Sequence, residues 1–423
     1  MKRSLVLIAT AVLVAGCGAG GGSENSPQQP GKITLEWWHL STSEPLKSLW
    51  AQRAKEFEAK NPNVTIKATV LENDAYKAKL TTITQSGKAP DLFATWGGGV
   101  LKQQIDAGLV KDISADVADV LPTFTPAALS AYTVDGKTYG LPTDIGMVGF
   151  WYNKKLFEKA GIAEPPTTWS AFLEDVKKLK AAGLTPIALA GKEKWPGHYY
   201  WAYLAMRIAG LPALQQAATD HDFTKPDFLA ASRQVKALAD LQPFQKGFLG
   251  AAYSTPDGQS ATVSNGKAAM ELMGQWAPSV QKDSGKGLGD DLGFFPFPAV
   301  EGGKGAATEA FGGGGGLAVG ANAPKEAVDF VKFMTEMGNH SKAVESGGVL
   351  PVLKGEEGAV KDPSLKQVAS MLATASGYQL YLDQAYPPAV GQQVNDSVAE
   401  LIAGTKTPEE VGQDITEVAK SEG

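Results

Sequence analysis

Residues 33–70 have the sequence ITLEWWHLSTSEPLKSLWAQRAKEFEAKNPNVTIKATV, and this stretch determines the expected fold class. Within 33–39 apolar and polar residues alternate, which is the period of two typical of a strand. Residues 46–57 instead space their apolar side chains by three and four, as an amphipathic helix does, and Asn61 with the following proline ends it. Residues 64–70 alternate again. This order predicts an α/β protein with a parallel or mixed sheet and helices on both faces.

A ligand site is expected at one edge of this sheet, because α/β sheets bind ligands at the carboxyl ends of their strands. Trp38 and His39 end the first strand, and residues 90–96 predict a further strand that ends at Trp96. These side chains give the first indication of where the site lies.

A second unit is expected to begin near Met147. Residues 147–152 are apolar and aromatic, 169–179 have helical spacing, and 185–189 again suggest a strand. The last helix is expected to begin at Thr407, since Thr, Pro and then Glu at 407, 408 and 410 form a capping sequence. A chain of 423 residues is also long enough for two or three domains.

Composition excludes several classes of protein. Apolar residues make up 43% and charged residues 20%, so neither a disordered chain nor a multi-span membrane protein is expected. The net charge of −6 without a basic run argues against nucleic-acid binding. Motifs for phosphate cradles, metalloproteases and serine hydrolases are absent from the sequence, and we expect no cofactor and no metal ligands.

The N-terminus predicts export. Lys2 and Arg3 precede the apolar run 5–15, which is too short to span a membrane and is typical of a secretory signal. The run ends just before Cys17, the single cysteine of the chain, in a sequence that resembles a bacterial lipobox. We therefore expect a lipoprotein signal segment with its lipobox at 1–17, cleavage that exposes Cys17 for lipidation, and a flexible tether at 18–32, with an ordinary signal peptide cut near Ala15 as the alternative.

Several segments in this order resemble the extracellular solute-binding proteins of carbohydrate ABC transporters, the broad family of the maltose-binding protein. They are WWH at 37–39, PDLF at 90–93, WGG at 96–98, GLPTD at 140–144, FWYNK at 150–154, PTTW at 166–169, NGKAAM at 265–270 and GQW at 274–276.

The resemblance implies two α/β lobes joined by crossover strands and closing on a sugar by a hinge motion. Lobe 1 would comprise 33–144 and 315–347, and lobe 2 would comprise 145–314 and 348–423. It implies no catalysis, an ABC permease as the partner, the membrane contacted only through a lipid anchor, and a monomer.

The chemistry of a sugar agrees with the residues available. A pyranose has an apolar face that stacks on an aromatic ring and hydroxyls that need directed donors and acceptors. By the resemblance Trp276, Trp96 and the 381–384 region contact the sugar. The 381–384 region is expected to be a loop between C-terminal helices, and 195–200 is expected to be a loop that forms a cleft wall. The predicted ligand-binding residues are Trp38, His39, Trp96, Asp144, Trp195, His198, Gln275, Trp276, Tyr381 and Asp383.

Other prominent residues are expected to be structural. Trp37, Trp50, Trp151 and Trp169 are assigned to the core, His340 to the surface, and the glycines 312–316 to flexible backbone near a lobe crossover that comes close to the ligand.

Ligand identity follows from the resemblance alone. The opening 37–42 and the tail 381–388 are similar to relatives that take up xylo-oligosaccharides or α-galactosides such as raffinose. The alternatives are an exported glycoside hydrolase, which needs two carboxylates about 5–9.5 Å apart, and a sugar sensor or adhesin on the same fold.

Overall fold

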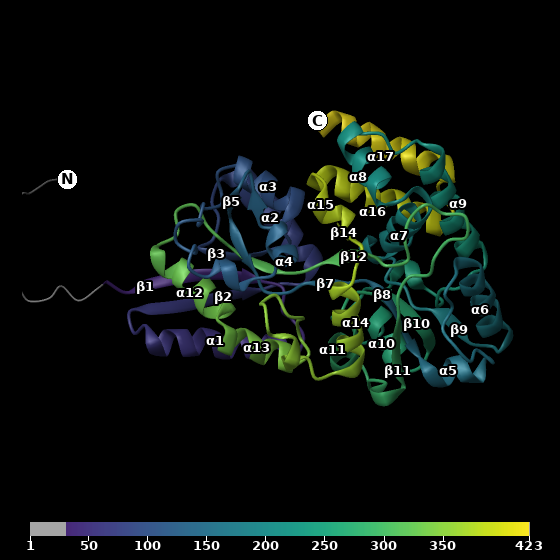
Figure 1. The fold of residues 1–423 in the computed structure, drawn as a ribbon, viewed down its shortest axis with the longest axis horizontal. Helices are drawn as coiled ribbons and strands as arrows, with labels where there is room; N and C mark the ends of the chain where they lie inside the picture. Colours follow the sequence, from purple (N-terminus) through teal and green to yellow (C-terminus); the bar gives the residue numbers. More distant parts are fainter. Residues whose placement is uncertain (1–30, 423) are drawn as a thin grey trace, which may run out of the picture.

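The computed structural model describes residues 31–422 and has two lobes side by side, with the crossover strands between them (Figure 1). The predicted signal segment 1–17, the lipidation site Cys17 and most of the tether 18–32 lie outside the described residues. None of the helices within 31–422 is long and apolar enough to cross a membrane.

A mixed sheet forms the first lobe, in the order β2-β1-β3-β13-β6. β1 pairs in parallel with β2 and β3, whereas β13 is antiparallel to β3 and β6. The strands are β1 (Ile33–His39), β2 (Val64–Val70), β3 (Leu92–Thr95), β6 (Gly140–Pro142) and β13 (Gly316–Val319). The predicted mixed α/β fold is confirmed.

Helices cover this sheet because each has one apolar face. In α1 (Leu46–Lys60), the buried residues Trp50, Arg53, Ala54 and Phe57 follow the helical period. The other helices of this part are α2 (Asn73–Ser86), α3 (Gly98–Asp106), α4 (Pro126–Ser130), α12 (Lys325–Thr335) and α13 (Met337–Glu345). A short hairpin of β4 (Thr133–Val134) and β5 (Lys137–Thr138) and a 3-10 turn at Leu121–Thr123 complete it.

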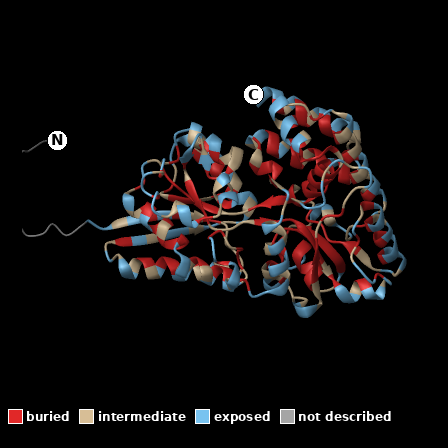
Figure 2. Ribbon diagram, in the orientation of Figure 1, coloured by how far each residue is buried: buried red, intermediate tan, exposed pale blue. Residues whose placement is uncertain are grey.

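A second sheet, in the order β11-β8-β10-β9, forms the centre of the other lobe. Its strands are β8 (Gly149–Asn153), β9 (Thr185–Ile187), β10 (Ala268–Met273) and β11 (Leu292–Phe295). Every residue of β10 is buried, as expected for a strand covered on both faces. Figure 2 shows the buried residues gathered around both sheets.

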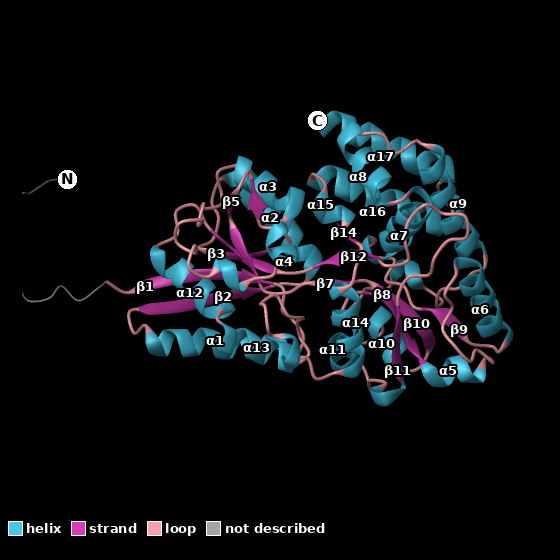
Figure 3. Cartoon of the chain, in the orientation of Figure 1, coloured by secondary structure: helices cyan, strands magenta, loops and turns pink. Residues whose placement is uncertain are grey.

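The remaining helices include those that cover the second sheet and the C-terminal helices (Figure 3). They are α5 (Lys154–Lys159), α6 (Trp169–Ala181), α7 (Trp195–Ala209), α8 (Leu211–Asp220), α9 (Pro226–Asp240), α10 (Gln259–Ser264), α11 (Ala277–Ser284), α14 (Pro363–Ala373), α15 (Leu382–Ala385), α16 (Pro388–Ala403) and α17 (Pro408–Glu422). The C-terminal helices α16 and α17 lie beside α7 and α9. Further 3-10 turns lie at Phe248–Gly250, Gly289–Asp291 and Glu357–Ala359.

The crossover region is a third sheet, in the order β14-β12-β7, with β7 (Gly146–Met147), β12 (Glu309–Gly313) and β14 (Gly377–Leu380). The chain passes from β6 to β7 through 143–145 and from β12 to β13 through Gly314 and Gly315. These two connections lie against each other, because the backbone N–H groups of Thr143 and Asp144 both donate to the carbonyl of Gly315. The glycine block therefore lies at a lobe crossover, as predicted.

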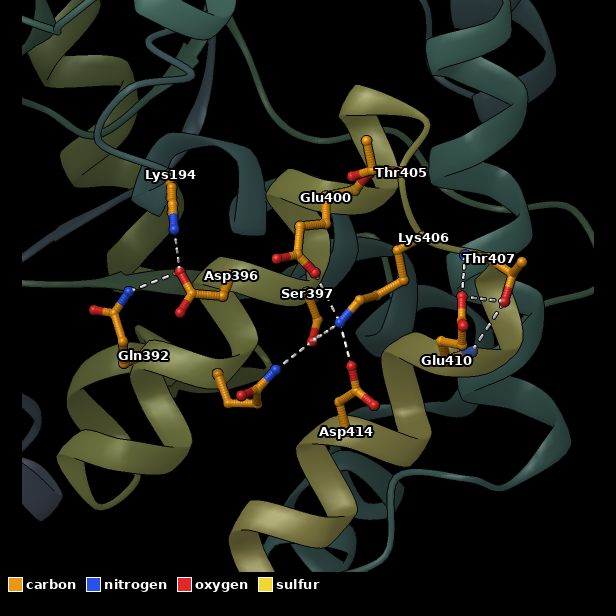
Figure 4. Close-up of polar contacts among 11 residues, drawn as sticks. Lys194, Gln392, Asp396, Ser397, Glu400, Thr405, Lys406, Thr407, Glu410 and Asp414 are labelled. Carbon is orange, nitrogen blue, oxygen red and sulfur yellow. Dashed lines mark hydrogen bonds and ion pairs between the residues drawn. The ribbon is translucent and has the colours of Figure 1, made fainter.

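The C-terminal helices α16 and α17 are fastened by the turn between them (Figure 4). Lys406 donates to Glu400 at 2.9 Å and contacts Asp414, and Thr407 and Glu410 form the predicted capping box. In the same view Lys194, at the start of α7, pairs with Asp396 of α16 at 2.7 Å. This ion pair ties the helix that begins with Trp195 to the C-terminal helices.

Candidate ligand cavity between the lobes

An interlobe cavity of about 280 Å³ lies at the carboxyl ends of the parallel strands. Its wall on the first-lobe side comes from residues that follow β1, β2 and β3, namely the 40–44 loop, Glu72 with Asn73, and Trp96. The position is the one that the strand-end rule predicts for an α/β sheet. The opposite wall comes from the start of α7, the loop before α10, the start of α11, and α15.

Seven of the ten predicted ligand-binding residues line the interlobe cavity: Trp96, Asp144, Trp195, Gln275, Trp276, Tyr381 and Asp383. Gly314 and Gly315 of the glycine block also line it. The structure therefore brings together residues that are up to about 290 positions apart in the sequence.

Trp38, His39 and His198 do not line this cavity. β1 continues as a strand through His39, so the chain turns toward the cavity only at Leu40. Trp38 instead packs beside α2, where the Lys79 ammonium lies 4.0 Å from its ring centre. His39 is buried beside Trp37, accepts a hydrogen bond from the Ser41 N–H, and burial lowers its pKa to about 4.

The predicted loop at 195–200 is instead the first part of α7, which is a correction to the sequence analysis. Trp195 and Tyr199 are four residues apart and so lie on one face of the helix, toward the cavity. His198 falls on another face, is fully buried, and packs edge-on against Tyr199 and Phe311. Burial lowers the pKa of His198 to about 4.

Two further assignments change. The segment from Leu382 to Ala385 is the short helix α15 rather than a loop. His340, assigned to the surface, is fully buried, with Nδ1 2.7 Å from a carboxylate oxygen of Glu356. The core assignments of Trp37, Trp50, Trp151 and Trp169 are confirmed, since all four are buried.

Aromatic rings form one wall of the cavity. Tyr381 stacks on Tyr199 with ring centres 5.3 Å apart and meets Trp276 edge-on at 6.2 Å. The ring centre of Trp195 lies 5.7 Å from that of Tyr199 and 5.6 Å from that of Tyr253. The rings hold one another in place, so this wall is formed without a ligand.

Two glycines lie so close to cavity-lining side chains that any Cβ atom at their positions would collide with them. A Cβ atom at Gly274 would lie 2.2 Å from the Trp276 ring, and one at Gly146 would lie 1.7 Å from Gln275 Oε1. Any larger residue at either position would displace a cavity-lining side chain.

Five polar atoms of this wall are buried and have no hydrogen-bond partner among the described residues. They are Trp195 Nε1, Tyr253 Oη, Gln275 Oε1, Tyr381 Oη and Gln384 Oε1, and all five residues line the cavity. An unpaired buried polar group costs about 1–3 kcal/mol, so such groups call for partners. A ligand rich in hydroxyls can both donate to and accept from this set.

Asp144 lies at the crossover with both carboxylate oxygens engaged. Gln275 Nε2 donates to Oδ2 at 2.5 Å, and the Leu350 N–H donates to Oδ1 at 2.8 Å. Burial raises the pKa of Asp144 to about 7, against the lowering effect of these hydrogen bonds and of His340. Each oxygen retains a lone pair for a ligand hydroxyl.

Asp383 pairs with Lys77 across the cavity. Lys77 Nζ, from α2, lies 2.7 Å from Asp383 Oδ2, and Asn395 Nδ2 donates to the same oxygen at 3.4 Å. Burial acts to raise the pKa of Asp383, but Lys77, His198 and Asn395 together hold it below its ordinary value. On the same side of the cavity, Ser254 Oγ donates to Glu72 at 3.2 Å.

Sequence reasoning missed Lys77, Tyr253 and Ser254, and it included Tyr199 only as part of the predicted cleft wall 195–200; all four line the cavity. A signal existed for Lys77, since it lies one helical turn after Asn73, which directly follows β2 and its loop. Tyr199 follows Trp195 by four residues once the segment is recognised as a helix. Tyr253 and Ser254 lie in an irregular loop, for which the sequence carries no such signal.

Fold and cavity together define a two-lobed binding protein of the periplasmic type. Residues 41–340 match the family described as "Bacterial extracellular solute-binding protein", and the chain belongs to this family.

Similar proteins cover most of the chain. The multiple sugar-binding protein of Streptococcus mutans is 27% identical over 389 residues, which is 89% of this chain and 87% of that protein. A structure from a study of xylan utilization by the thermophilic bacterium Caldanaerobius polysaccharolyticus is 31% identical, covers 91% of this chain and 99% of its own, and has a TM-score of 0.84. A chitin oligosaccharide binding protein is 29% identical, covers 92% of this chain and 98% of its own, and also has a TM-score of 0.84.

Proposed function

We propose that this protein captures a short, uncharged oligosaccharide in the interlobe cavity and delivers it to the permease of an ABC transporter. One observation carries the proposal: an aromatic wall that also presents five buried polar atoms without partners. Stacking rings beside unpaired donors and acceptors suit the apolar face and hydroxyl rim of a sugar.

The charges around the cavity support an uncharged ligand. The charged residues that line it are Glu44, Glu72, Asp144, Asp383 and Lys77, and Lys77 is already paired with Asp383. An anionic ligand would face uncompensated carboxylates, whereas a neutral sugar needs no counter-charge.

Within this class we favour a xylo-oligosaccharide or an α-galactoside such as raffinose. The relative from the xylan study supports the first choice, while a structure in complex with raffinose, 22% identical, shares the fold alone. The chitin oligosaccharide binding protein adds N-acetylated sugars to the panel that must be tested.

Release of the ligand is proposed to follow separation of the lobes about the crossover strands. Opening must break the Lys77–Asp383 and Glu72–Ser254 contacts, which join the two walls. The lobe bounds 33–144 with 315–347, and 145–314 with 348–423, belong to this proposal. The two sheets support these bounds. The strands of the first sheet lie within 33–142 and at 316–319, and the strands of the second sheet lie within 149–295.

The mature protein is further proposed to act as a monomer anchored through lipidated Cys17 at the outer face of a bacterial membrane. The basic start, the short apolar run and the single cysteine support this location.

A glycoside hydrolase is the second candidate, and one observation favours it. The pKa values of Asp144 and Asp383 are displaced in opposite directions, as they are in an acid–nucleophile pair. Binding without chemistry remains our proposal, because both oxygens of Asp144 and one of Asp383 already accept hydrogen bonds from protein groups.

The test is a thermal-shift screen of residues 18–423 against xylo-, malto-, cello-, chito- and galacto-oligosaccharides, with chromatography of every hit. A ligand at a hundredfold excess over its Kd stabilises the folded state by about 2.7 kcal/mol. We expect at least one hit that is recovered intact. Cleavage of the hit would establish the hydrolase, and the absence of any hit would reject sugar capture.

A further inference from the structure

His340 is a buried histidine that lies behind the interlobe cavity and does not line it. It belongs to α13, whereas its partners belong to the crossover after β6 and to the segment near Glu357–Ala359. Nδ1 lies 2.7 and 2.9 Å from the two carboxylate oxygens of Glu356, and Nε2 lies 2.8 Å from the carbonyl oxygen of Thr143.

The geometry fixes the proton on Nε2. A carbonyl oxygen can only accept, so Nε2 must carry a hydrogen and donate it to Thr143.

The hydrogen bonds of Glu356 then decide the charge of the pair. Ser341 Oγ donates to one of its oxygens at 3.0 Å, and the Leu353 N–H approaches the other at 3.5 Å. Donors on both oxygens favour the ionised carboxylate, which accepts from Nδ1 as well. His340 therefore donates from both ring nitrogens, to the Thr143 carbonyl through Nε2 and to the Glu356 carboxylate through Nδ1.

Asp144 directly follows Thr143, and its carboxylate is the cavity-lining anion at the crossover. The Leu350 N–H that binds Asp144 belongs to the same connection that carries Leu353 and Glu356. The charged group facing Asp144 is His340, and the tyrosines around it are Tyr132, Tyr378 and Tyr381.

We propose that His340 is a positioning residue of the ligand site. Its Nε2–H holds the Thr143–Asp144 crossover in place. Its positive charge keeps Asp144 ionised, so that the carboxylate can accept hydrogen bonds from ligand hydroxyls. This inference rests on the proposed function, since it assigns a role in ligand capture to a residue outside the cavity. Its energetic basis is the attraction between a buried cation and a half-buried carboxylate at low effective dielectric.

Two substitutions separate the charge from the hydrogen bond. In His340→Gln, the side-chain amide can reach the Thr143 carbonyl but carries no charge. In His340→Asn, the shorter amide can replace only the contact with Glu356. His221→Asn is the matched control, because His221 lies at the C-cap of α8, away from the cavity, with φ of 53° that asparagine tolerates.

The experiment measures the Kd of each variant for a sugar that binds the wild type, by isothermal titration calorimetry between pH 5 and pH 9, with circular dichroism to confirm folding. We expect both His340 variants to bind at least about fivefold more weakly at pH 7, and the acid limb of the affinity profile to move by about one pH unit or more to higher pH. In His340→Gln, affinity should return to within about threefold of wild type at pH 9, where Asp144 ionises without the cation, whereas His340→Asn should remain weaker because it also lacks the hydrogen bond to Thr143.

Asp144→Asn distinguishes a charge effect of His340 on Asp144 from a purely structural role of His340. In the Asp144→Asn background, His340→Gln should change the Kd by less than about twofold, since there is no charge left to support. An equal loss at every pH, an unchanged acid limb, or the same loss in the Asp144→Asn background would overturn the inference. Failure of the wild type to bind any sugar would instead reject the proposed function. If His340→Asn does not fold, His340→Gln alone still tests the charge.

Discussion

Lys77 Nζ and Asp383 Oδ2 lie 2.7 Å apart and join α2, which packs on the first sheet, to the C-terminal helix α15. Asp383 is 8% exposed and Lys77 is about a third exposed at its side chain, so the pair lies at the boundary between cavity and protein. The contacts between the cavity walls thus include a charge pair as well as apolar contacts.

Lys77→Met should lower the free energy of unfolding by about 2 kcal/mol, because it leaves the Asp383 carboxylate buried without its cation. The double variant Lys77→Met with Asp383→Asn should recover more than half of this loss. Urea unfolding of the two single variants and the double variant measures the coupling. Additive losses would show that the two side chains do not stabilise each other.

Trp276→Ala should weaken sugar binding by about 2 kcal/mol, which is roughly a 30-fold rise in Kd, since it removes a ring from the aromatic wall. Gly274→Ala should weaken binding in the same direction, because the added Cβ would lie 2.2 Å from the Trp276 ring. Titration calorimetry with the sugar found in the screen checks both variants. An unchanged Kd for Trp276→Ala would remove this residue from the site.

Trp38→Phe should leave the Kd within about twofold of wild type, because Trp38 does not line the cavity and its ring packs beside Lys79. The same titration measures it, with Trp96→Phe as the counterpart that does line the cavity. A large loss for Trp38→Phe would restore Trp38 to the predicted ligand-binding set.

Glu271→Gln should flatten the dependence of stability on pH. Glu271 is fully buried in β10, and burial raises its pKa to about 7 despite hydrogen bonds from Gln281 and Gln259. The unfolded chain ionises this group near its ordinary pKa of 4.5. As the pH rises from about 4.5 to 7, the folded state therefore binds more protons than the unfolded state, and stability falls.

The expected size of this effect is on the order of 3 kcal/mol in the wild type, and it should be largely absent in Glu271→Gln. Chemical denaturation at pH 5 and pH 8 measures the difference between the two proteins. If the wild type and Glu271→Gln lose the same stability between pH 5 and pH 8, Glu271 is not protonated in the folded protein near pH 5.

The fold could be predicted from the sequence because its signals are local. The alternation in 33–39 and 64–70 and the helical spacing between them gave β1, α1 and β2 with the bounds that the structure has. The capping residues Thr407 and Glu410 gave the start of α17 for the same reason. Each of these patterns depends on neighbours within a few residues.

The cavity could be predicted only in part, since its residues meet through contacts between distant segments. Trp96, Gln275 and Trp276 were found because strand ends and motif positions mark them. The directions in which the side chains of Trp38 and His198 point depend instead on whether a strand or a helix continues through these residues. The burial of His340 depends on Glu356 and Thr143, 16 and 197 residues away, and no local pattern reveals such partners.

The most direct test of sugar capture is isothermal titration calorimetry of residues 18–423 with the sugar found in the screen, followed by mass analysis of the recovered ligand. We predict one site per chain, a Kd that rises roughly 30-fold in Trp276→Ala, and a ligand recovered intact. Cleaved ligand, or a Kd that is the same in wild type and Trp276→Ala, would contradict the account.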